Sequence, residues 1–340
     1  MNVSETSAGN PPGRFVPSEK ANRIPESAVF SGSSVCVVGN INRDVTLLSV
    51  PASPTLFEDG ETPVAAVVET IGGGGANSAC MAAGLGASVG FAGKTGADPL
   101  AERLRRAMEK QGVRTFIVRD PKCATGTTVA INFSSGHRHF LSCLPNNQTL
   151  EFGDIELAAL EGCSHLLRAD VWFSQTMLEG GNRRLFAEAR RRGLTTSLDI
   201  NFDPRRSGGS KEEIAHRKEL LRGVLDLVDV AHGNVRELCE FTDSPHLDVA
   251  LERLSGRGVK AVIVHMGAEG AGCYTGGQLI REPASPADAV IHSTGSGDLL
   301  SMCMILMHAR QDLSIQKKLA VSNGVVREFI EGRRTLIAPI

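Results

Sequence analysis

The chain has 340 residues and a formal net charge of -2, and 41% of its residues are hydrophobic, which is enough for a large α/β domain. The small net charge provides no electrostatic attraction to nucleic acid or to an anionic membrane. No apolar run approaches the roughly 20 residues of a membrane-spanning helix. We therefore expect a small molecule as the partner, and neither nucleic acid nor membrane.

The N-terminal segment 1–34 is rich in Ser, Pro, Gly and Asn and lacks the basic-then-apolar pattern of a signal peptide. We expect it to be a disordered leader that precedes one domain over 35–340. The sequence contains 8 cysteines with no C-x-x-C pair, and several of them lie in apolar runs. This usage favours reduced, buried thiols in a cytoplasmic protein over zinc ligands or disulfides.

The first regular element is a buried strand, predicted by the apolar run from Val35 that ends at Gly39. Asn42 and Asp44 follow at alternate positions just beyond its end. Ligands of open α/β sheets bind outside the carboxyl ends of the strands, so these two side chains could hydrogen-bond a polyhydroxy ligand. A turn with Asx hydrogen bonds is the simpler alternative.

A run of glycines from Gly72 to Gly75 leads into an Ala-rich helix expected over about 78–85. Consecutive glycines increase the entropy lost on folding, so their use here indicates close approach of the backbone to a ligand. Asn77 lies in the first turn of this helix and is expected to face the same ligand. The run lacks the third glycine of the dinucleotide-binding motif.

The triplet Gly93-Lys94-Thr95 matches the end of a phosphate-binding loop, but the earlier glycine of that motif is absent. The triplet also continues a strand-like run, and no helix is expected to begin at Lys94. We therefore reject a phosphate-binding loop here. Asp98 is instead the expected N-cap of an amphipathic helix over 99–111.

Short strands without intervening helices are expected at 64–68, 115–118, 127–133 and 138–142, the last two joined as a hairpin. They predict a second, small sheet, a β lid built from about 45–70 and 123–143. After Leu150 strands and helices alternate. The expected strands are 166–167, 195–198, 227–230 and 261–264, and the expected helices are 179–192, 211–223, 235–241 and 247–257. This alternation predicts a doubly wound, mostly parallel sheet flanked by helices.

Three of these strands end in polar clusters, namely 199–205, Asn234 to Glu237, and 266–272. Each cluster alone is ordinary loop chemistry: an Asx turn, a helix cap or a glycine turn. Together they bring acids, amides and glycines to one edge of the sheet. This convergence favours a phosphate-bearing ligand with a magnesium ion.

The same edge receives Gly295-Ser296-Gly297-Asp298, which opens an apolar helical run. Backbone N–H groups at a helix start attract phosphate. Asp298 is either a helix cap, the commoner role of Asp here, or a base that takes a proton from a hydroxyl beside the phosphate. The polar clusters at the other strand ends favour the base.

From about Val35 to Ile337 the sequence resembles the ribokinase-like (PfkB-type) carbohydrate kinase family. The first family signature resembles residues 72–77 continuing through 93–98, and the second resembles 293–298. An N-x-x-E pattern is met by Asn234 and Glu237, and a D-x-N pattern by Asp199 and Asn201. The resemblance implies a central sheet flanked by helices, a β lid that often makes dimer contacts, and transfer of the ATP γ-phosphate to a primary hydroxyl.

The resemblance also implies roles for particular residues. Asp298 would be the base, and the N–H groups of Gly295, Ser296 and Gly297 would form an anion hole. The acceptor would be held by Asn42, Asp44, Gly73, Gly74 and Asn77. The phosphates and Mg²⁺ would lie near Asn201, Asn234 and Glu237, with Glu237 reaching the metal through water. Gly267 and Gly270 would line the ATP site.

Two departures from the family pattern bear on specificity. His292 stands where ribokinase-type members usually have an acid that helps hold a monovalent cation, so potassium activation is not expected. Gly74 replaces the ribokinase-type lysine, so ribose is a less secure acceptor. We therefore predict a kinase for a small ribose-, fructose- or sugar-acid-like acceptor that forms a homodimer through its lid. A nucleoside kinase and a non-catalytic sugar- or nucleotide-binding regulator are the alternatives.

Overall fold

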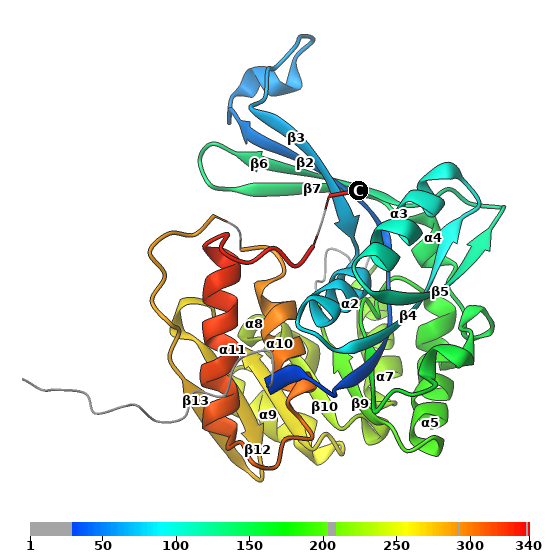
Figure 1. Ribbon diagram of the computed structural model, residues 1–340, viewed down its shortest axis with the longest axis vertical. Helices are drawn as coiled ribbons and strands as arrows, with labels where there is room; N and C mark the ends of the chain where they lie inside the picture. Colours follow the sequence, from blue (N-terminus) through cyan, green and yellow to red (C-terminus); the bar gives the residue numbers. More distant parts are fainter. Residues whose placement is uncertain (1–28, 203–208, 292, 338) are drawn as a thin grey trace, which may run out of the picture.

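The computed structural model describes residues 29–202, 209–291, 293–337 and 339–340. Within these residues the larger sheet has nine strands, parallel from β5 to β11 and completed by an antiparallel hairpin of β12 and β13 (Figure 1). Their order is β13 (Gln278–Glu282), β12 (Ala271–Thr275), β11 (Ala261–His265), β10 (Val230–Asn234), β9 (Thr195–Asp199), β8 (His165–Arg168), β1 (Ser34–Val38), β4 (Ser88–Gly96) and β5 (Val113–Asp120).

Both faces of this sheet are buried, as the side chains of β1 illustrate. Val35 and Val37 join one hydrophobic core, and Cys36 and Val38 join the other, because successive side chains of a strand point to opposite faces. The first core contains residues of α2 (Gly74–Gly84), α3 (Pro99–Lys110), α10 (Ser296–Leu306) and α11 (Ile315–Ile330). The second contains residues of α5 (Asn182–Arg191), α7 (Lys211–Arg222), α8 (Val235–Thr242) and α9 (Leu247–Gly256).

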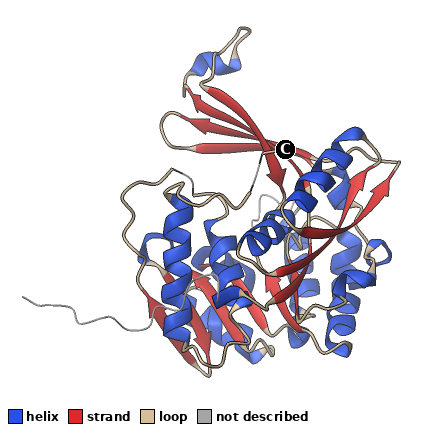
Figure 2. Cartoon of the chain, in the orientation of Figure 1, coloured by secondary structure: helices blue, strands red, loops and turns tan. Residues whose placement is uncertain are grey.

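Helices on both faces of a mostly parallel sheet confirm the predicted doubly wound fold (Figure 2). From β1 the chain proceeds in one direction to β4 and β5, and β8 to β11 then extend the sheet on the other side of β1. The order of the strands therefore reverses between β1 and β8, the kind of position at which α/β sheets bind ligands.

The predicted lid is a separate four-stranded sheet that projects from the main body (Figure 1). Its order is β3 (Ala66–Gly72), β2 (Asn42–Val50), β6 (Thr127–Phe133) and β7 (Arg138–Cys143). The C-terminal residues contact this sheet, since Thr70 bridges Pro339 and the Ile340 N–H lies 3.2 Å from the Glu69 carbonyl oxygen. The lid strands are therefore tied both to the start of α2 and to the end of the chain.

Short helices complete the described chain. They are η1 (Pro54–Phe57), α4 (Pro145–Gln148), η2 (Phe152–Asp154), η3 (Leu157–Leu160), η5 (Leu225–Leu227) and η6 (Gly267–Glu269), with a π-helical turn, η4 (Met177–Gly181), before α5. No described helix is long and apolar enough to cross a membrane. All 8 cysteines are free, as expected. Four of them are buried as expected, namely Cys36, Cys80, Cys273 and Cys303, whereas Cys143 is exposed.

Four expectations differ from the structure. The strand expected at 115–118 with the small sheet is part of β5, which lies at the edge of the larger sheet beside β4. Residues 1–28 lie outside the described part, but Val29 and Phe30, expected within the disordered leader, are buried in the core. The strand expected at 227–230 was misplaced, because β10 is Val230–Asn234 and carries the buried polar residue His232. Asn42 and Asp44 were expected in a loop, but they lie in β2.

The rejection of a phosphate-binding loop at Lys94 agrees with the structure. Lys94 lies within β4, where its Nζ is 3.0 Å from Asp154 Oδ2 and 3.3 Å from Asp120 Oδ2. The lysine is thus engaged in a nearly buried ion-pair cluster. Asp98 caps α3 as predicted, with its Oδ1 accepting the Ala101 N–H at 3.0 Å.

Candidate active site

The glycine run packs the start of α2 tightly against the end of β1. A Cβ on Gly73 would lie 2.4 Å from the Asn40 carbonyl oxygen, and a Cβ on Gly75 would lie 2.6 Å from the Gly39 Cα. Gly73 also has a positive φ of 93°, which favours glycine. The close approach predicted for these glycines is therefore made here to the protein's own backbone.

Asp170, which follows β8, holds the start of α2 in this position. Its Oδ2 accepts hydrogen bonds from the N–H groups of Gly75 at 2.7 Å and Asn40 at 2.9 Å, and its Oδ1 accepts from Gly74 at 3.3 Å. A carboxylate is stabilising at a helix N-terminus because it satisfies unpaired N–H groups and complements the helix dipole. Sequence analysis missed Asp170, because a single Asp after a strand carries no recognisable pattern.

Asn42 and Asp44 lie together beside the glycine run. Asn42 Nδ2 donates to Asp44 Oδ1 at 2.7 Å, and a Cβ on Gly72 would lie only 2.1 Å from the same oxygen. Burial raises the pKa of Asp44 to about 7, against the opposing effect of the Asn42 hydrogen bond, and the negative charge of Asp170 raises it further. The structure thus brings together Asn42, Asp44 and the glycines that the sequence placed at the acceptor site.

Two amide oxygens near this position are buried without a partner. Asn40 Oδ1 and Asn77 Oδ1 accept no hydrogen bond from any described residue. Asn77 lies in the first turn of α2, where the sequence placed it, and its N–H bonds the Gly73 carbonyl oxygen at 2.9 Å. Buried polar atoms without a partner are costly, so a water or a ligand hydroxyl is expected to satisfy them.

The start of α10 is the second component of the site. Gly295 is the N-cap with a φ of 81°, and a Cβ there would lie 2.8 Å from Met81 Cε of α2. Ser296 donates both its N–H and its hydroxyl to the Ser293 carbonyl oxygen, at 3.4 and 2.9 Å. Gly297 and Asp298 follow in the first turn of this helix.

Acidic side chains near these two helix starts influence one another electrostatically. Burial raises the pKa of Asp199, at the end of β9, well above its ordinary value, and the negative charges of Asp298, Glu237 and Asp170 raise it further. The charge of Asp170 also raises the pKa of Asp44, so Asp170 acts electrostatically on both Asp44 and Asp199. This is the concentration of acids at one sheet edge that the sequence predicts.

One buried guanidinium lies within this acidic set. Arg168, at the end of β8, is 1% exposed and donates to the Val38 carbonyl oxygen at 3.2 Å and to Asn182 Oδ1 at 2.8 Å. Burial lowers the pKa of Arg168 to about 10, and the charges of Asp170 and Asp199 oppose that change. Arg168 therefore remains a cation at neutral pH and offsets part of the negative charge. It too was missed from sequence.

The N-x-x-E pattern forms a reciprocal cap at the start of α8. Asn234 Oδ1 accepts the Glu237 N–H at 2.9 Å, and Glu237 Oε2 accepts the Asn234 N–H at 2.9 Å. The helix-cap alternative is thus realised, and it presents the carboxylate at the carboxyl edge of the sheet. Asn201 lies beyond β9 with a positive φ of 31°, while residues 203–205 of the same cluster lie outside the described residues.

The two glycines expected at the ATP site differ in their surroundings. A Cβ on Gly270 would lie 2.1 Å from the Glu282 carbonyl oxygen, so contact with β13 explains this glycine. A Cβ on Gly267 would meet no atom within 4 Å, and its φ is 59°. Gly267 therefore borders open space at the end of β11, whereas Gly270 is required by packing.

The lid reaches the loop before α10 through Arg138. This residue begins β7, and its guanidinium donates to the hydroxyl of Thr294. The contact joins the lid to the segment that positions Gly295. His292, the residue on which the monovalent-cation expectation rests, lies outside the described residues.

The chain is similar to known sugar and nucleoside kinases. The model of the pfkB family carbohydrate kinases matches residues 33–301. The aminoimidazole riboside kinase of Salmonella typhimurium is 25% identical over 233 residues, 67% of this chain and 70% of that protein. The fructokinase of Klebsiella pneumoniae is 27% identical over 251 residues, 72% of this chain and 77% of that protein. The ribokinase of Arabidopsis thaliana, complexed with ribose and ATP, has the same fold, with a TM-score of 0.70 at 19% identity over 90% of this chain and 95% of that one.

Proposed function

The chain belongs to the pfkB family of carbohydrate kinases, and we propose that it transfers the γ-phosphate of ATP to a primary hydroxyl of a small sugar. The observation that carries this proposal is the pairing of two helix starts at one sheet edge. One is the start of α10 with Asp298, and the other is the start of α2 beside Asn42 and Asp44. A phosphate donor and a polyhydroxy acceptor need to meet at such a position.

In this proposal Asp298 takes the proton from the acceptor hydroxyl as that oxygen attacks the γ-phosphorus. The bond from the γ-phosphorus to the β,γ-bridging oxygen breaks, and ADP leaves with its electron pair. The N–H groups of Gly295, Ser296 and Gly297 stabilise the negative charge on the transferring phosphoryl group, that of Ser296 in exchange for its long 3.4 Å bond to the Ser293 carbonyl oxygen. Phosphoryl transfer requires positioning and charge stabilisation more than covalent catalysis, which is what a helix start with an adjacent carboxylate can supply.

The acceptor is held at the start of α2. Asn42, Asp44 and Asn77 bond its hydroxyl groups, and Gly73 and Gly74, which pack against Asn40 and Asp170, border it. The unpartnered Asn77 Oδ1 and the raised pKa of Asp44 support this assignment, because both identify polar groups that are buried without full hydrogen bonding. A ribose-, fructose- or sugar-acid-like molecule has hydroxyl groups in sufficient number to satisfy them.

ATP is held near the ends of β9, β10 and β11, with Asn201, Asn234 and Glu237 around its phosphates and Gly267 and Gly270 beside the nucleotide. Among the described residues no group of three or more His, Cys, Asp or Glu side chains could hold a metal ion alone. Mg²⁺ does not require one, since it commonly binds one or two carboxylates, phosphate oxygens and water. Glu237 would hold it through water, and the ion would neutralise charge on the phosphates.

A nucleoside acceptor is the second candidate, because the Salmonella relative is named as a riboside kinase.

We also propose that the protein is a homodimer through its lid. All of β7 is exposed, and its Phe140 and Leu141 are 41% and 54% exposed, which supports a partner on this sheet. The cytoplasmic location remains a prediction.

The direct test measures ADP release that depends on Mg²⁺ and ATP across a panel of pentoses, ketohexoses, sugar acids and nucleosides. Turnover is expected with a single acceptor class, and the class identifies which of the two candidates is correct. Turnover with nucleosides alone would overturn the sugar assignment. ATP binding without turnover on any compound would contradict both candidates.

A further inference from the structure

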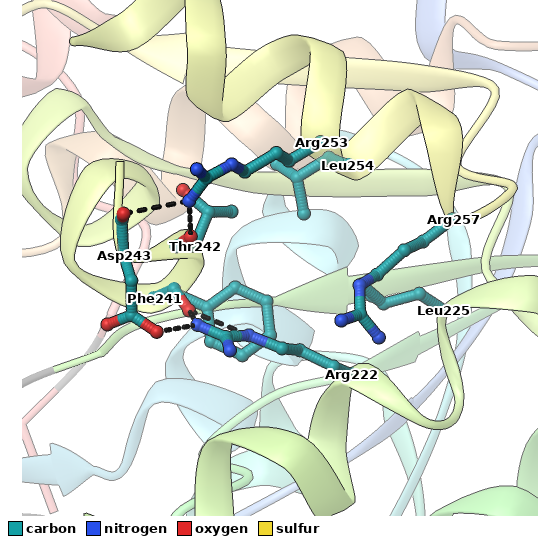
Figure 3. Close-up of a pocket in the computed structure, with 8 residues that line it drawn as sticks. All are labelled: Arg222, Leu225, Phe241, Thr242, Asp243, Arg253, Leu254 and Arg257. Atoms are coloured by element: carbon teal, nitrogen blue, oxygen red, sulfur yellow. Dashed lines mark hydrogen bonds and ion pairs between the residues drawn. The ribbon is translucent and has the colours of Figure 1, made fainter. Parts of the chain in front are cut away.

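A cavity of about 190 Å³ lies between α7, α8 and α9, away from the candidate active site (Figure 3). Leu225, on its wall, precedes β10, and Arg257 precedes β11, so both lie toward the amino ends of these strands. Thr242, also on the wall, ends α8, whose first residues lie at the carboxyl end of β10. The cavity is therefore at the edge of the sheet opposite Asn234 and Glu237.

Two of the three arginines that line this cavity bond backbone carbonyl groups at the end of α8. Arg222 donates to the Phe241 carbonyl oxygen at 3.0 Å, and Arg253 donates to the carbonyl oxygens of Thr242 and Asp243 at 2.7 and 2.8 Å. Cations at a helix C-terminus bond its last carbonyl groups and complement the helix dipole. These bonds hold both guanidinium groups in fixed positions at the cavity wall, as Figure 3 shows.

Arg253 and Arg257 have N–H groups that are not used in these bonds. Arg253 uses only Nη1, and Arg257 donates no hydrogen bond to any described residue. Arg257 Nη2 lies 3.6 Å from Glu219 Oε2, and both side chains are about half exposed, at 46% and 57%. Donors on two arginines are therefore open to a ligand.

Positive charge predominates around the cavity. Arg222, Arg253 and Arg257 line it together with one carboxylate, Asp243. Behind these residues Lys218 is paired with Asp243, and Glu219 with Arg222 and Arg257. Asp243 is already bonded to Lys218 at 2.7 Å and to Arg222 at 2.5 Å. The remaining positive charge disfavours a cation and favours an anion.

The positions of the lining side chains indicate which kind of anion fits the cavity. Guanidinium groups on different sides of the cavity can bond a tetrahedral anion through several oxygens, whereas a carboxylate offers only two. Leu225, Phe241 and Leu254 supply an apolar wall next to these groups. We propose that this cavity binds the phosphoryl group of a small molecule, at a site separate from the transferred phosphate.

Arg257→Gln is the most informative variant, because Arg257 takes no part in capping α8. The protein is first saturated with Mg²⁺ and the non-hydrolysable ATP analogue AMP-PNP, which fills the phosphate positions of the proposed active site. Inorganic phosphate and glycerol 3-phosphate are then titrated by calorimetry at constant ionic strength. The matched control is Arg106→Gln, an exposed arginine of α3 that is 74% exposed and ion-paired with Glu102.

We expect the wild-type protein and the Arg106→Gln variant to bind phosphate equally, and Arg257→Gln to bind it at least about tenfold more weakly. Arg257→Glu, which reverses the charge, should abolish binding while the thermal unfolding of the variant stays cooperative. Tighter binding of glycerol 3-phosphate than of inorganic phosphate would assign an organic phosphate ester, and equal binding would assign the phosphoryl group alone. The proposal is overturned if neither compound binds the saturated wild-type protein, or if Arg257→Gln binds both as well as the control.

Discussion

The imidazole ring of His265 lies against Gly297 in the first turn of α10. A Cβ on Gly297 would lie 2.7 Å from His265 Nδ1, and His265 Nε2 lies 2.6 Å from Ser301 Oγ, further along the same helix. Burial lowers the pKa of His265 to about 4, so the ring is neutral at physiological pH. The end of β11 thus determines how closely the start of α10 approaches the sheet.

The first prediction follows from this contact. Gly297→Ala forces the new methyl group against the imidazole ring and should lower the free energy of unfolding by about 1–3 kcal/mol. In a His265→Ala background the ring is absent, so the same substitution should cost much less. Urea unfolding of the four proteins of this double-mutant cycle measures the difference. An equal loss in both backgrounds would mean that His265 is not the obstacle.

The second prediction concerns the proposed base. Asp298→Asn keeps the size of the side chain but removes its basicity, so kcat should fall by about 10²–10⁴-fold while ATP affinity changes little. Steady-state kinetics with the acceptor found by the panel, and calorimetry with AMP-PNP, provide the two measurements. Asp248→Asn is the control, because Asp248 is an exposed acid in the first turn of α9. Unaltered turnover in Asp298→Asn would exclude Asp298 from the mechanism.

The third prediction separates acceptor binding from ATP binding. Asn42 is 2% exposed and donates to Asp44, so Asn42→Ala removes one amide and alters the carboxyl group beside it. We expect the KM for the acceptor to rise by at least about tenfold and the KM for ATP by less than about twofold. The two constants act as controls for each other in one enzyme preparation. A parallel rise in both would indicate that Asn42 is structural.

The fourth prediction uses the raised pKa of Asp44, which is about 7 in the folded protein against an ordinary value of about 4. Between these values the folded state binds more protons than the unfolded state. The contribution of protonated Asp44 to stability is therefore fully present below about pH 4 and is lost as the pH rises through 7. Asp44→Asn stays neutral, so the stability of the variant relative to wild type should increase from pH 5 to pH 8.

We expect that increase to be about 1–2 kcal/mol, less than the full pKa shift would give because the side chain is partly exposed. Urea unfolding at each pH measures it without any knowledge of the acceptor. A difference between the two proteins that does not change with pH would show that Asp44 titrates normally.

Patterns that lie within one segment were predictable from the sequence. The alternation of strands and helices after Leu150, the hairpin of β6 and β7 and the cap at Asp98 each depend on neighbouring residues, and the structure contains all three. The strand β10 was misplaced because it reads Val-Ala-His-Gly-Asn, and a buried strand is recognised by its apolar run. His232 at its centre is 2% exposed, so burial of a polar side chain concealed the strand.

Contacts between distant segments were not predictable. Asp170 bonds the N–H of Gly75, 95 residues away, and Arg138 bonds Thr294, 156 residues away. Nothing near Asp170 or His265 in the sequence distinguishes either from an ordinary loop or strand residue. The glycine run was recognised as a place of close approach, but its partner depends on how β1, β8 and α2 pack together.

The fifth prediction tests Asp170, which accepts three backbone N–H groups at the start of α2. Asp170→Asn replaces one carboxylate oxygen by an NH₂ group that cannot accept these bonds, so we expect a loss of about 2–3 kcal/mol in the free energy of unfolding. The backbone should tolerate the change, because φ at Asp170 is 54° and Asn adopts this left-handed conformation readily. Asp243→Asn is the matched control, since φ at Asp243 is 51° and its carboxylate is 59% exposed and bonds the cations Lys218 and Arg222. That control should lose less than about 1 kcal/mol. Amide hydrogen exchange at Gly74 and Gly75 should quicken in Asp170→Asn alone, and unchanged exchange would show that other contacts hold the start of α2.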